Sequence, residues 1–176
     1  MSFAFKEVVE AAQAGLKDAP ENAIAEFSVS SRQVAGLESE VAVRQFKLAV
    51  DEPEALGGAD AAPNPVEYVL AALASCQEIT YRLYADALGI PLDGVSVDLK
   101  GPIDLRGFFA VDDSVRPGYQ GIEGTVTLDS PASQADLQRL KDAVDRHCPV
   151  LDILSNPTPV SLELAGAGSG EKTEAA

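Results

Sequence analysis

Two cysteines, Cys76 and Cys148, are the residues of this chain best suited to chemistry. A thiol reacts as its thiolate, and a nearby cation, a helix N-terminus or a metal lowers the pKa of a cysteine. Both cysteines fall in helical patterns, and two such thiols predict a redox pair. Two alternatives remain open: cysteines that only fill the core, and a structural disulfide, which would persist mainly in an oxidising compartment.

The segment around Cys76 predicts a long helix over residues 64–88. Asn64 suits the N-cap, Pro65 the first position and Glu67 the third, while Gly89 stops the pattern. Apolar residues lie all around this helix, which is typical of a buried one. We therefore expect Cys76 to face the core or an enclosed pocket, too far from the helix N-terminus to benefit from it.

Cys148 lies between two helical patterns. The first opens at Ser130 and ends near His147, and the second covers residues 150–154. Pro149 suits the first helical position, which makes Cys148 the N-cap of the second helix. That position favours a thiolate, so by local physics Cys148 has the better claim to a low pKa. We expect His147 to interact with the dipole at the end of the first helix.

Cys76 needs a cation from elsewhere in the fold. Arg44 is the preferred candidate, because a strand over residues 38–50 would place it on the same face as Phe46 and Leu48. Arg32, in or near the preceding hairpin turn, is the second candidate, although a solvated turn residue is its simpler role.

The order of the remaining patterns predicts an α+β fold. A helix over residues 3–17 precedes alternating strand patterns, with a Gly- and Pro-rich loop over residues 51–63. We predict a helical extension over residues 1–20, one domain over 21–165 and a disordered tail over 166–176. The predicted strands cover residues 23–31, 38–50, 94–100, 119–128 and 160–164.

Composition excludes several classes of function. The 28 acidic and 13 basic residues give the chain a net charge of −15, which disfavours nucleic acids and anionic membranes as partners. No apolar run approaches the length of a membrane span, and no signal peptide is recognised, so we expect a cytoplasmic protein with reduced thiols. One histidine and two cysteines are too few to predict a metal site. The sequence has no nucleotide-binding fingerprint, so we expect no cofactor.

Several motifs together make the chain resemble the OsmC/Ohr family, the osmotically inducible protein C and organic hydroperoxide resistance proteins. Short segments at residues 51–53, 104–107 and 156–159 are similar to its OsmC-like branch. The family motifs are Leu56-Gly57-Gly58 before Asn64-Pro65, the helix from Ala71 to Cys76, residues 95–100 after Gly89-Ile90, and Cys148-Pro149-Val150.

This resemblance implies an OsmC-like fold, with antiparallel sheets around a long buried central helix, in an intertwined homodimer whose active sites lie at the subunit interface. It also implies a cysteine-dependent peroxidase that reduces organic hydroperoxides. In that mechanism Cys76 attacks the peroxide and becomes a sulfenic acid, and Cys148 resolves it as a disulfide. A dithiol of the lipoamide type, or another thiol, would then restore both cysteines. An apolar pocket would favour oily hydroperoxides over hydrogen peroxide.

The chain departs from the hydroperoxide-resistance branch at one position. The glutamate that directly follows Asn-Pro in that branch is replaced here by Val66, and Glu67 comes one place later. Nine residues separate Glu67 from Cys76, which puts the two on opposite faces of the helix. We expect Glu67 to close a capping box with Asn64. A different thiol-dependent activity, or a non-catalytic dimeric module that binds small molecules in an apolar pocket, therefore remains open.

Overall fold

The predicted long helix is the central element of the fold. The structure, a computed structural model, describes residues 4–166. Helix α2 (Pro65–Leu88) begins with the predicted capping box: the Glu67 N–H donates to Asn64 Oδ1 at 2.9 Å, and the Asn64 N–H donates to Glu67 Oε2 at 2.8 Å. Gly89 ends the helix in the left-handed conformation, with φ of 68°. These end signals are local, which is why the pattern alone located both ends.

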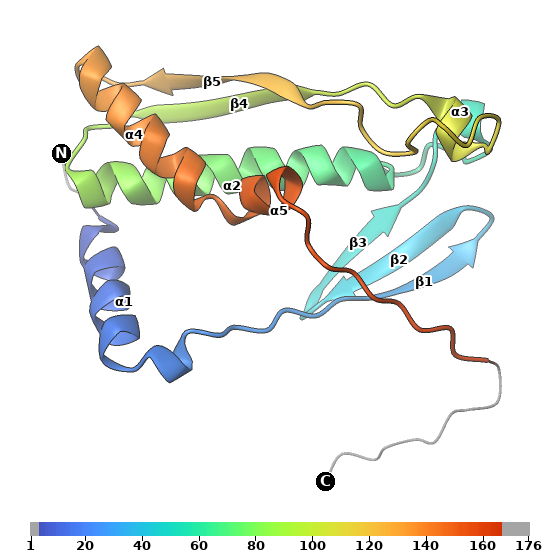
Figure 1. Cartoon of the computed structure of the whole chain (residues 1–176), viewed down its shortest axis with the longest axis horizontal. Helices are drawn as coiled ribbons and strands as arrows, with labels where there is room; N and C mark the ends of the chain where they lie inside the picture. The colour runs from blue at the N-terminus through green and yellow to red at the C-terminus, as the bar shows by residue number, and fades with distance from the viewer. Residues whose placement is uncertain (1–3, 167–176) are drawn as a thin grey trace, which may run out of the picture.

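A two-stranded sheet and two further helices pack on α2. Strands β4 (Gly94–Lys100) and β5 (Glu123–Asp129) are antiparallel, and their ribbon runs alongside α2, while α4 (Gln134–His147) and α5 (Pro149–Ser155) pack on the same helix (Figure 1). Seven residues form the buried core of this layer: Tyr81, Ala85, Ile90, Leu92, Leu140, Val144 and Cys148. The core therefore joins the helix that carries one cysteine to the junction that carries the other.

A separate three-stranded sheet precedes α2. Its strands are β1 (Ser30–Ala35), β2 (Glu38–Val43) and β3 (Phe46–Val50), antiparallel in the order β1-β2-β3. The prediction of one strand over residues 38–50 was wrong, because the chain reverses at Arg44 and Gln45 and pairs Val43 with Phe46. Arg44 has a φ of 52°, a conformation that a strand does not adopt.

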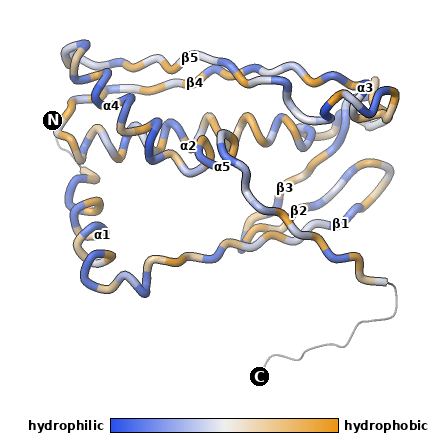
Figure 2. The backbone as a smooth tube through the Cα atoms, in the orientation of Figure 1, coloured by the Kyte–Doolittle hydropathy of each residue, from blue (hydrophilic) through white to orange (hydrophobic). Residues whose placement is uncertain are grey.

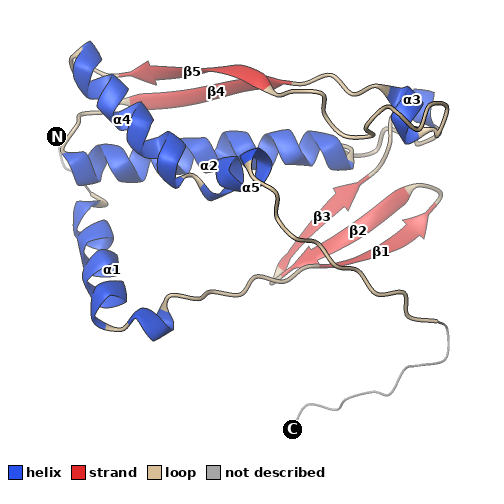
Figure 3. Ribbon diagram, in the orientation of Figure 1, coloured by secondary structure: helices blue, strands red, loops and turns tan. Residues whose placement is uncertain are grey.

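This sheet and two extended segments, residues 23–29 and 157–166, lie largely uncovered in the chain. The sheet stands away from β4 and β5 in Figure 1, and the Tyr68 hydroxyl, which donates to the Ala49 carbonyl at 2.7 Å, connects β3 to α2. The strands predicted at residues 23–31 and 160–164 were wrong for this chain: residues 23–29 and 157–166 are loops (Figure 3). Hydrophobic residues continue along both loops (Figure 2), where Phe27 is 90% exposed and Leu162 is 91% exposed.

Other predictions held with shifted boundaries. The α+β fold class is confirmed, and α1 (Lys6–Asp18) confirms the N-terminal helix. Strand β5 starts four residues later than predicted, and α4 begins after Ser133, whose hydroxyl accepts from the Asp136 N–H, instead of after Ser130. A short helix, α3 (Leu105–Phe108), lies in the loop between β4 and β5.

Two further expectations concern burial and boundaries. Helix α2 is buried along one side only in the single chain, because Ile79 is exposed, so the expectation of a helix buried all round was wrong here. The predicted boundaries of the extension at residue 20 and of the domain at residue 165 stay predictions. Of the predicted tail, residues 167–176 lie outside the described residues.

A buried carboxylate organises the loop that leads into α2. Asp51 Oδ2 accepts hydrogen bonds from the backbone N–H groups of Ala59, at 3.0 Å, and Ala61, at 3.1 Å. Backbone hydrogen bonds, that from Ala61 first, hold the pKa of Asp51 below its usual value. The ionised carboxylate thus stabilises the folded loop.

The loop therefore predicts a pH dependence of stability. Because the pKa of Asp51 is lower in the folded than in the unfolded chain, its stabilisation is present above the unfolded pKa of about 4 and is lost as the pH falls through the folded pKa. Urea unfolding measures the free energy of unfolding at pH 7 and at pH 3. We expect the fall in this free energy from pH 7 to pH 3 to be smaller in Asp51→Asn than in the wild type. The exposed Asp113→Asn serves as the control, and an unchanged pH dependence in Asp51→Asn would contradict the assignment.

Candidate active site

The two cysteines meet in the core. The Sγ atoms of Cys76 and Cys148 lie 3.3 Å apart, although 72 residues separate them along the chain, and both thiols are free. Cys148 is 1% exposed and Cys76 is partly buried. The predicted pair is therefore brought together by the fold, at a separation that lets one sulfur react with the other after a small movement.

The backbone at Cys148 fits the prediction of a helix junction. The Cys148 N–H donates to the Val144 carbonyl at 2.9 Å and so closes α4, while the Cys148 carbonyl accepts from the Asp152 N–H at 3.0 Å and so opens α5. Pro149 occupies the first position of α5, as predicted. This arrangement fixes the direction of the Cys148 side chain toward α2.

The surroundings of Cys76 act on its pKa in both directions. Burial raises the pKa of the Cys76 thiol, and the Cys148 side chain beside it raises it further. The backbone N–H of Val150 lowers it, and so does the side chain of Thr80, whose hydroxyl donates to the Cys76 carbonyl at 2.7 Å. Val150 lies in the first turn of α5, where backbone N–H groups have no partner within the helix, so its N–H is free to act on Cys76. Sequence reasoning had connected that helix start with Cys148 instead.

The two candidate arginines lie apart from this pair in the single chain. Arg44 lies in the turn between β2 and β3 and not on a strand face as predicted; its guanidinium lies 5.3 Å from the centre of the Phe46 ring. Arg32 lies within β1 and not in a turn, and it pairs with Glu40 at 2.7 Å. No arginine of residues 4–166 is among the groups that shift the pKa of Cys76.

The whole arrangement can be compared with known proteins. Residues 57–163, more than half of the chain, match the family described as OsmC-like protein. The chain belongs to the OsmC-like family. This membership confirms the resemblance found in the sequence. No match was found among curated protein sequences.

Solved structures agree on the fold of this OsmC-like chain. An OsmC-like protein from Mycoplasma pneumoniae has a TM-score of 0.65 at 19% identity, over 74% of this chain and 88% of the other. An organic hydroperoxide resistance protein OsmC from Legionella pneumophila has a TM-score of 0.57 at 21% identity, over 73% and 90%. One from Vibrio cholerae, with captopril bound in one of its active sites, has a TM-score of 0.55 at 17% identity, over 74% and 86%. At these identities the likeness establishes the fold alone.

The sequence of the OsmC-like chain singles out two further residues, His147 and Glu67, and misses a third that lies beside Cys76. His147 stacks on Tyr84 with ring centres 5.2 Å apart, at the end of α4. Glu67 closes the capping box far along α2 from the thiols, as expected. Thr80 was missed as a site residue, although its spacing of four from Cys76 places both on one face of α2. That spacing was the available signal.

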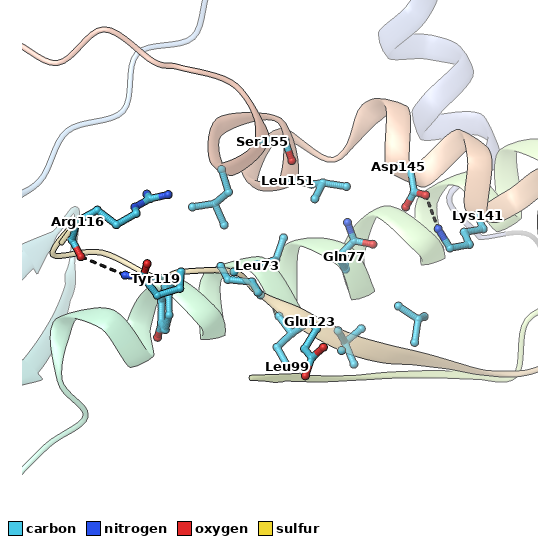
Figure 4. Close-up of a pocket in the computed structure, with 17 residues that line it drawn as sticks. Leu73, Gln77, Leu99, Arg116, Tyr119, Glu123, Lys141, Asp145, Leu151 and Ser155 are labelled. Carbon is cyan, nitrogen blue, oxygen red and sulfur yellow. Dashed lines mark hydrogen bonds and ion pairs between the residues drawn. The ribbon is translucent and has the colours of Figure 1, made fainter. Parts of the chain in front are cut away.

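The described part of the OsmC-like chain has a cavity but neither a metal-binding cluster nor a membrane-spanning helix. Within residues 4–166, no group of three or more His, Cys, Asp or Glu side chains is placed to hold a metal ion. The helices of that same range include none that is long and apolar enough to cross a membrane. A cavity of about 720 Å³ lies between α2, the β4–β5 sheet and α5, and neither cysteine lines it (Figure 4).

The environment of Cys76 makes a prediction for the OsmC-like site. Replacing Thr80 by valine keeps the side-chain shape but removes the hydroxyl that donates to the Cys76 carbonyl and lowers the pKa of the Cys76 thiol. In a Cys148→Ser background, where Cys76 is the one thiol, we expect iodoacetamide to react about threefold to tenfold more slowly at pH 8. Thr80→Ser, which keeps a hydroxyl, should react nearly as fast as the parent. Equal rates in the valine and serine variants would exclude the role of the hydroxyl.

Proposed function

We propose that the chain is a cysteine-dependent peroxidase that reduces organic hydroperoxides. The observation that carries this proposal is the distance of 3.3 Å between the two Sγ atoms, in a chain that belongs to the OsmC-like family. Relatives of the same fold are named organic hydroperoxide resistance proteins. In this proposal Cys76 is the nucleophile, because the Val150 N–H at the start of α5 favours its thiolate.

The reaction needs no resident cofactor. The Cys76 thiolate attacks the outer peroxide oxygen, the O–O bond breaks, and the products are a Cys76 sulfenic acid and, after protonation, an alcohol. The Cys148 thiol then attacks the sulfenic sulfur, releases water and forms the Cys76–Cys148 disulfide. A dithiol of the lipoamide type, or another thiol, exchanges with this disulfide and is itself oxidised. The cysteines start reduced, as expected of a cytoplasmic protein.

A second copy of the chain completes the proposed site. Monomers rarely expose large apolar surfaces, yet Phe27 and Leu162 stand almost free of the chain. An intertwined homodimer would cover these segments and both faces of the three-stranded sheet. The same association would bring Arg44, or Arg32, from the partner toward Cys76, where a guanidinium would lower the pKa of the thiol.

The proposed dimer can be tested by sedimentation equilibrium. We expect a mass about twice the 18.4 kDa of one chain, and a shift to monomer in the double variant Phe27→Glu, Leu162→Glu, because charges there cannot be buried between apolar surfaces. Val111→Glu, also at an exposed apolar residue but outside the two extended segments, should leave the dimer intact. A wild-type chain that sediments as a monomer would rule the dimer out.

The peroxidase proposal is tested by intact mass and thiol counting. The reduced protein should lose two mass units and both thiols after one equivalent of cumene hydroperoxide, as the balance of the two steps requires. Initial rates with cumene hydroperoxide should exceed those with hydrogen peroxide, because the surroundings of the pair are apolar. Two unreacted thiols would overturn the proposal, and a preference for hydrogen peroxide would overturn the substrate class.

One observation favours a second candidate. Within the single chain, burial and the neighbouring thiol raise the pKa of Cys76, as expected of a cysteine that only lines a pocket. A dimeric module that binds small molecules without catalysis, or a different thiol-dependent activity, would then explain the chain. Alkylation rates separate the non-catalytic module from a thiol-dependent enzyme, since an inert thiol reacts slowly at pH 7 whereas a catalytic thiolate reacts fast.

A further inference from the structure

The cavity of about 720 Å³ has a chemistry of its own. It lies between α2, α5 and the β4–β5 sheet, and its size is in the range of pockets that hold small organic molecules. Its walls combine polar side chains with aliphatic ones, among them Leu73, Leu99, Val126, Leu151 and Leu154. Cys76 and Cys148 do not line it, so the proposed peroxidase chemistry leaves this cavity unexplained.

A polar side chain with no hydrogen-bond partner in residues 4–166 lies in the middle of this cavity. Gln77 is 6% exposed, lines the cavity, and has no side-chain hydrogen bond within the described part of the chain. Figure 4 shows its amide group between the two ends of the cavity. Within residues 4–166 every buried side-chain nitrogen and oxygen has a hydrogen-bond partner, so the Gln77 amide, which has none, is open to the cavity and available to a ligand. A ligand with a polar group would satisfy both the oxygen and the nitrogen of this amide.

The charges around the cavity leave one positive group unmatched. Asp145 pairs with Lys141 at the far end, and Glu123 pairs with Lys100 at 3.1 Å. Arg116 reaches into the opposite end from the loop after α3 (Figure 4), and within residues 4–166 no carboxylate pairs with its guanidinium. Arg116 is an exposed residue, and its unpaired guanidinium beside the cavity is suited to pair with the carboxylate of a ligand.

We infer that this cavity binds a small organic acid, with one negative charge and an apolar body. Arg116 holds the acid group, Gln77 forms hydrogen bonds to a polar group of the ligand, and the aliphatic walls enclose the body. The site is separate from the cysteine pair and shares only its helices: Gln77 follows Cys76 in α2, and Leu151 follows Val150 in α5. It therefore does not depend on the proposed peroxidase activity.

The test uses a matched pair of probes, phenylbutyrate and phenylbutanol, which differ in the charged group. Calorimetry on the full-length protein should show the acid binding at least about tenfold more tightly than the alcohol. The acid should also shift the backbone amide resonances of residues 120–124, which line the cavity. Arg116→Gln should abolish the preference for the acid, and Gln77→Leu should weaken binding of the acid severalfold.

Two control variants complete the test. Arg139→Gln removes a positive charge that pairs with Asp136 outside the cavity and should bind like the wild type. Cys76→Ser should also bind the acid normally, which separates this site from the failure or success of the peroxidase proposal. Equal binding of acid and alcohol, a preference that survives in Arg116→Gln, or no binding of either probe, as when a second copy fills the cavity, would each overturn the inference.

Discussion

Replacing Cys76 by serine is expected to abolish the reduction of organic hydroperoxides, with a loss of at least about 10³-fold in turnover. A serine hydroxyl at this position is not ionised near neutral pH, so the hydrogen bond from the Val150 N–H has no thiolate to stabilise. Consumption of cumene hydroperoxide, followed with a dithiol reductant in excess, measures the loss.

The companion variant Cys148→Ser is the matched control for this experiment. It keeps the nucleophile but removes the resolving sulfur 3.3 Å away, so the first turnover should still proceed and leave a sulfenic acid that dimedone labels. Steady turnover through the disulfide should stop. If Cys76→Ser retained full turnover while Cys148→Ser lost it, the order of the two cysteines would be reversed.

Replacing Leu140 by alanine should have the largest effect on stability. Leu140 is 0% exposed and lies in the core that joins α4 to α2, where a truncated leucine leaves a cavity. We expect the free energy of unfolding to fall by about 3 kcal/mol. Urea denaturation, followed by circular dichroism, measures it. Because α4 leads directly into Cys148, this thiol should also react faster with alkylating reagents in the variant.

Leu16→Ala provides the comparison, since Leu16 is exposed on α1. The same change there should alter the free energy of unfolding by no more than about 0.5 kcal/mol. A Leu140→Ala protein as stable as the Leu16→Ala protein would mean that α4 does not depend on this core contact. The position of Cys148 would then need another explanation.

Helix ends show how far local signals reach in this chain. Asn64, Glu67 and Gly89 located α2 to within a residue, because a capping box and a left-handed glycine act through neighbouring backbone groups. Pro149 likewise marked the start of α5. Strands were predicted less well: the apolar alternation of residues 38–50 hid the turn at Arg44, because a turn of two residues interrupts the pattern only briefly.

The alternating segments at residues 23–29 and 160–164 failed for another reason. Their pattern is typical of strands, but a strand needs a neighbour for its backbone hydrogen bonds, and residues 4–166 of the single chain supply none to either segment. Their exposed apolar side chains, such as Phe27 and Leu162, are the physical basis for proposing a second copy. The alternating pattern predicts a strand but does not indicate whether the pairing strand belongs to the same chain or to a second copy.

By itself, the sequence determined the α+β class, the helices that carry the two cysteines, and the family to which the chain belongs, because these rest on local patterns and motifs. The tertiary structure decided that Cys76 and Cys148 touch, that the start of α5 serves Cys76, and that Arg116 and Gln77 share a cavity. Each of these pairs joins residues from different elements. Their separation is set by packing in the core, which no spacing along the chain encodes.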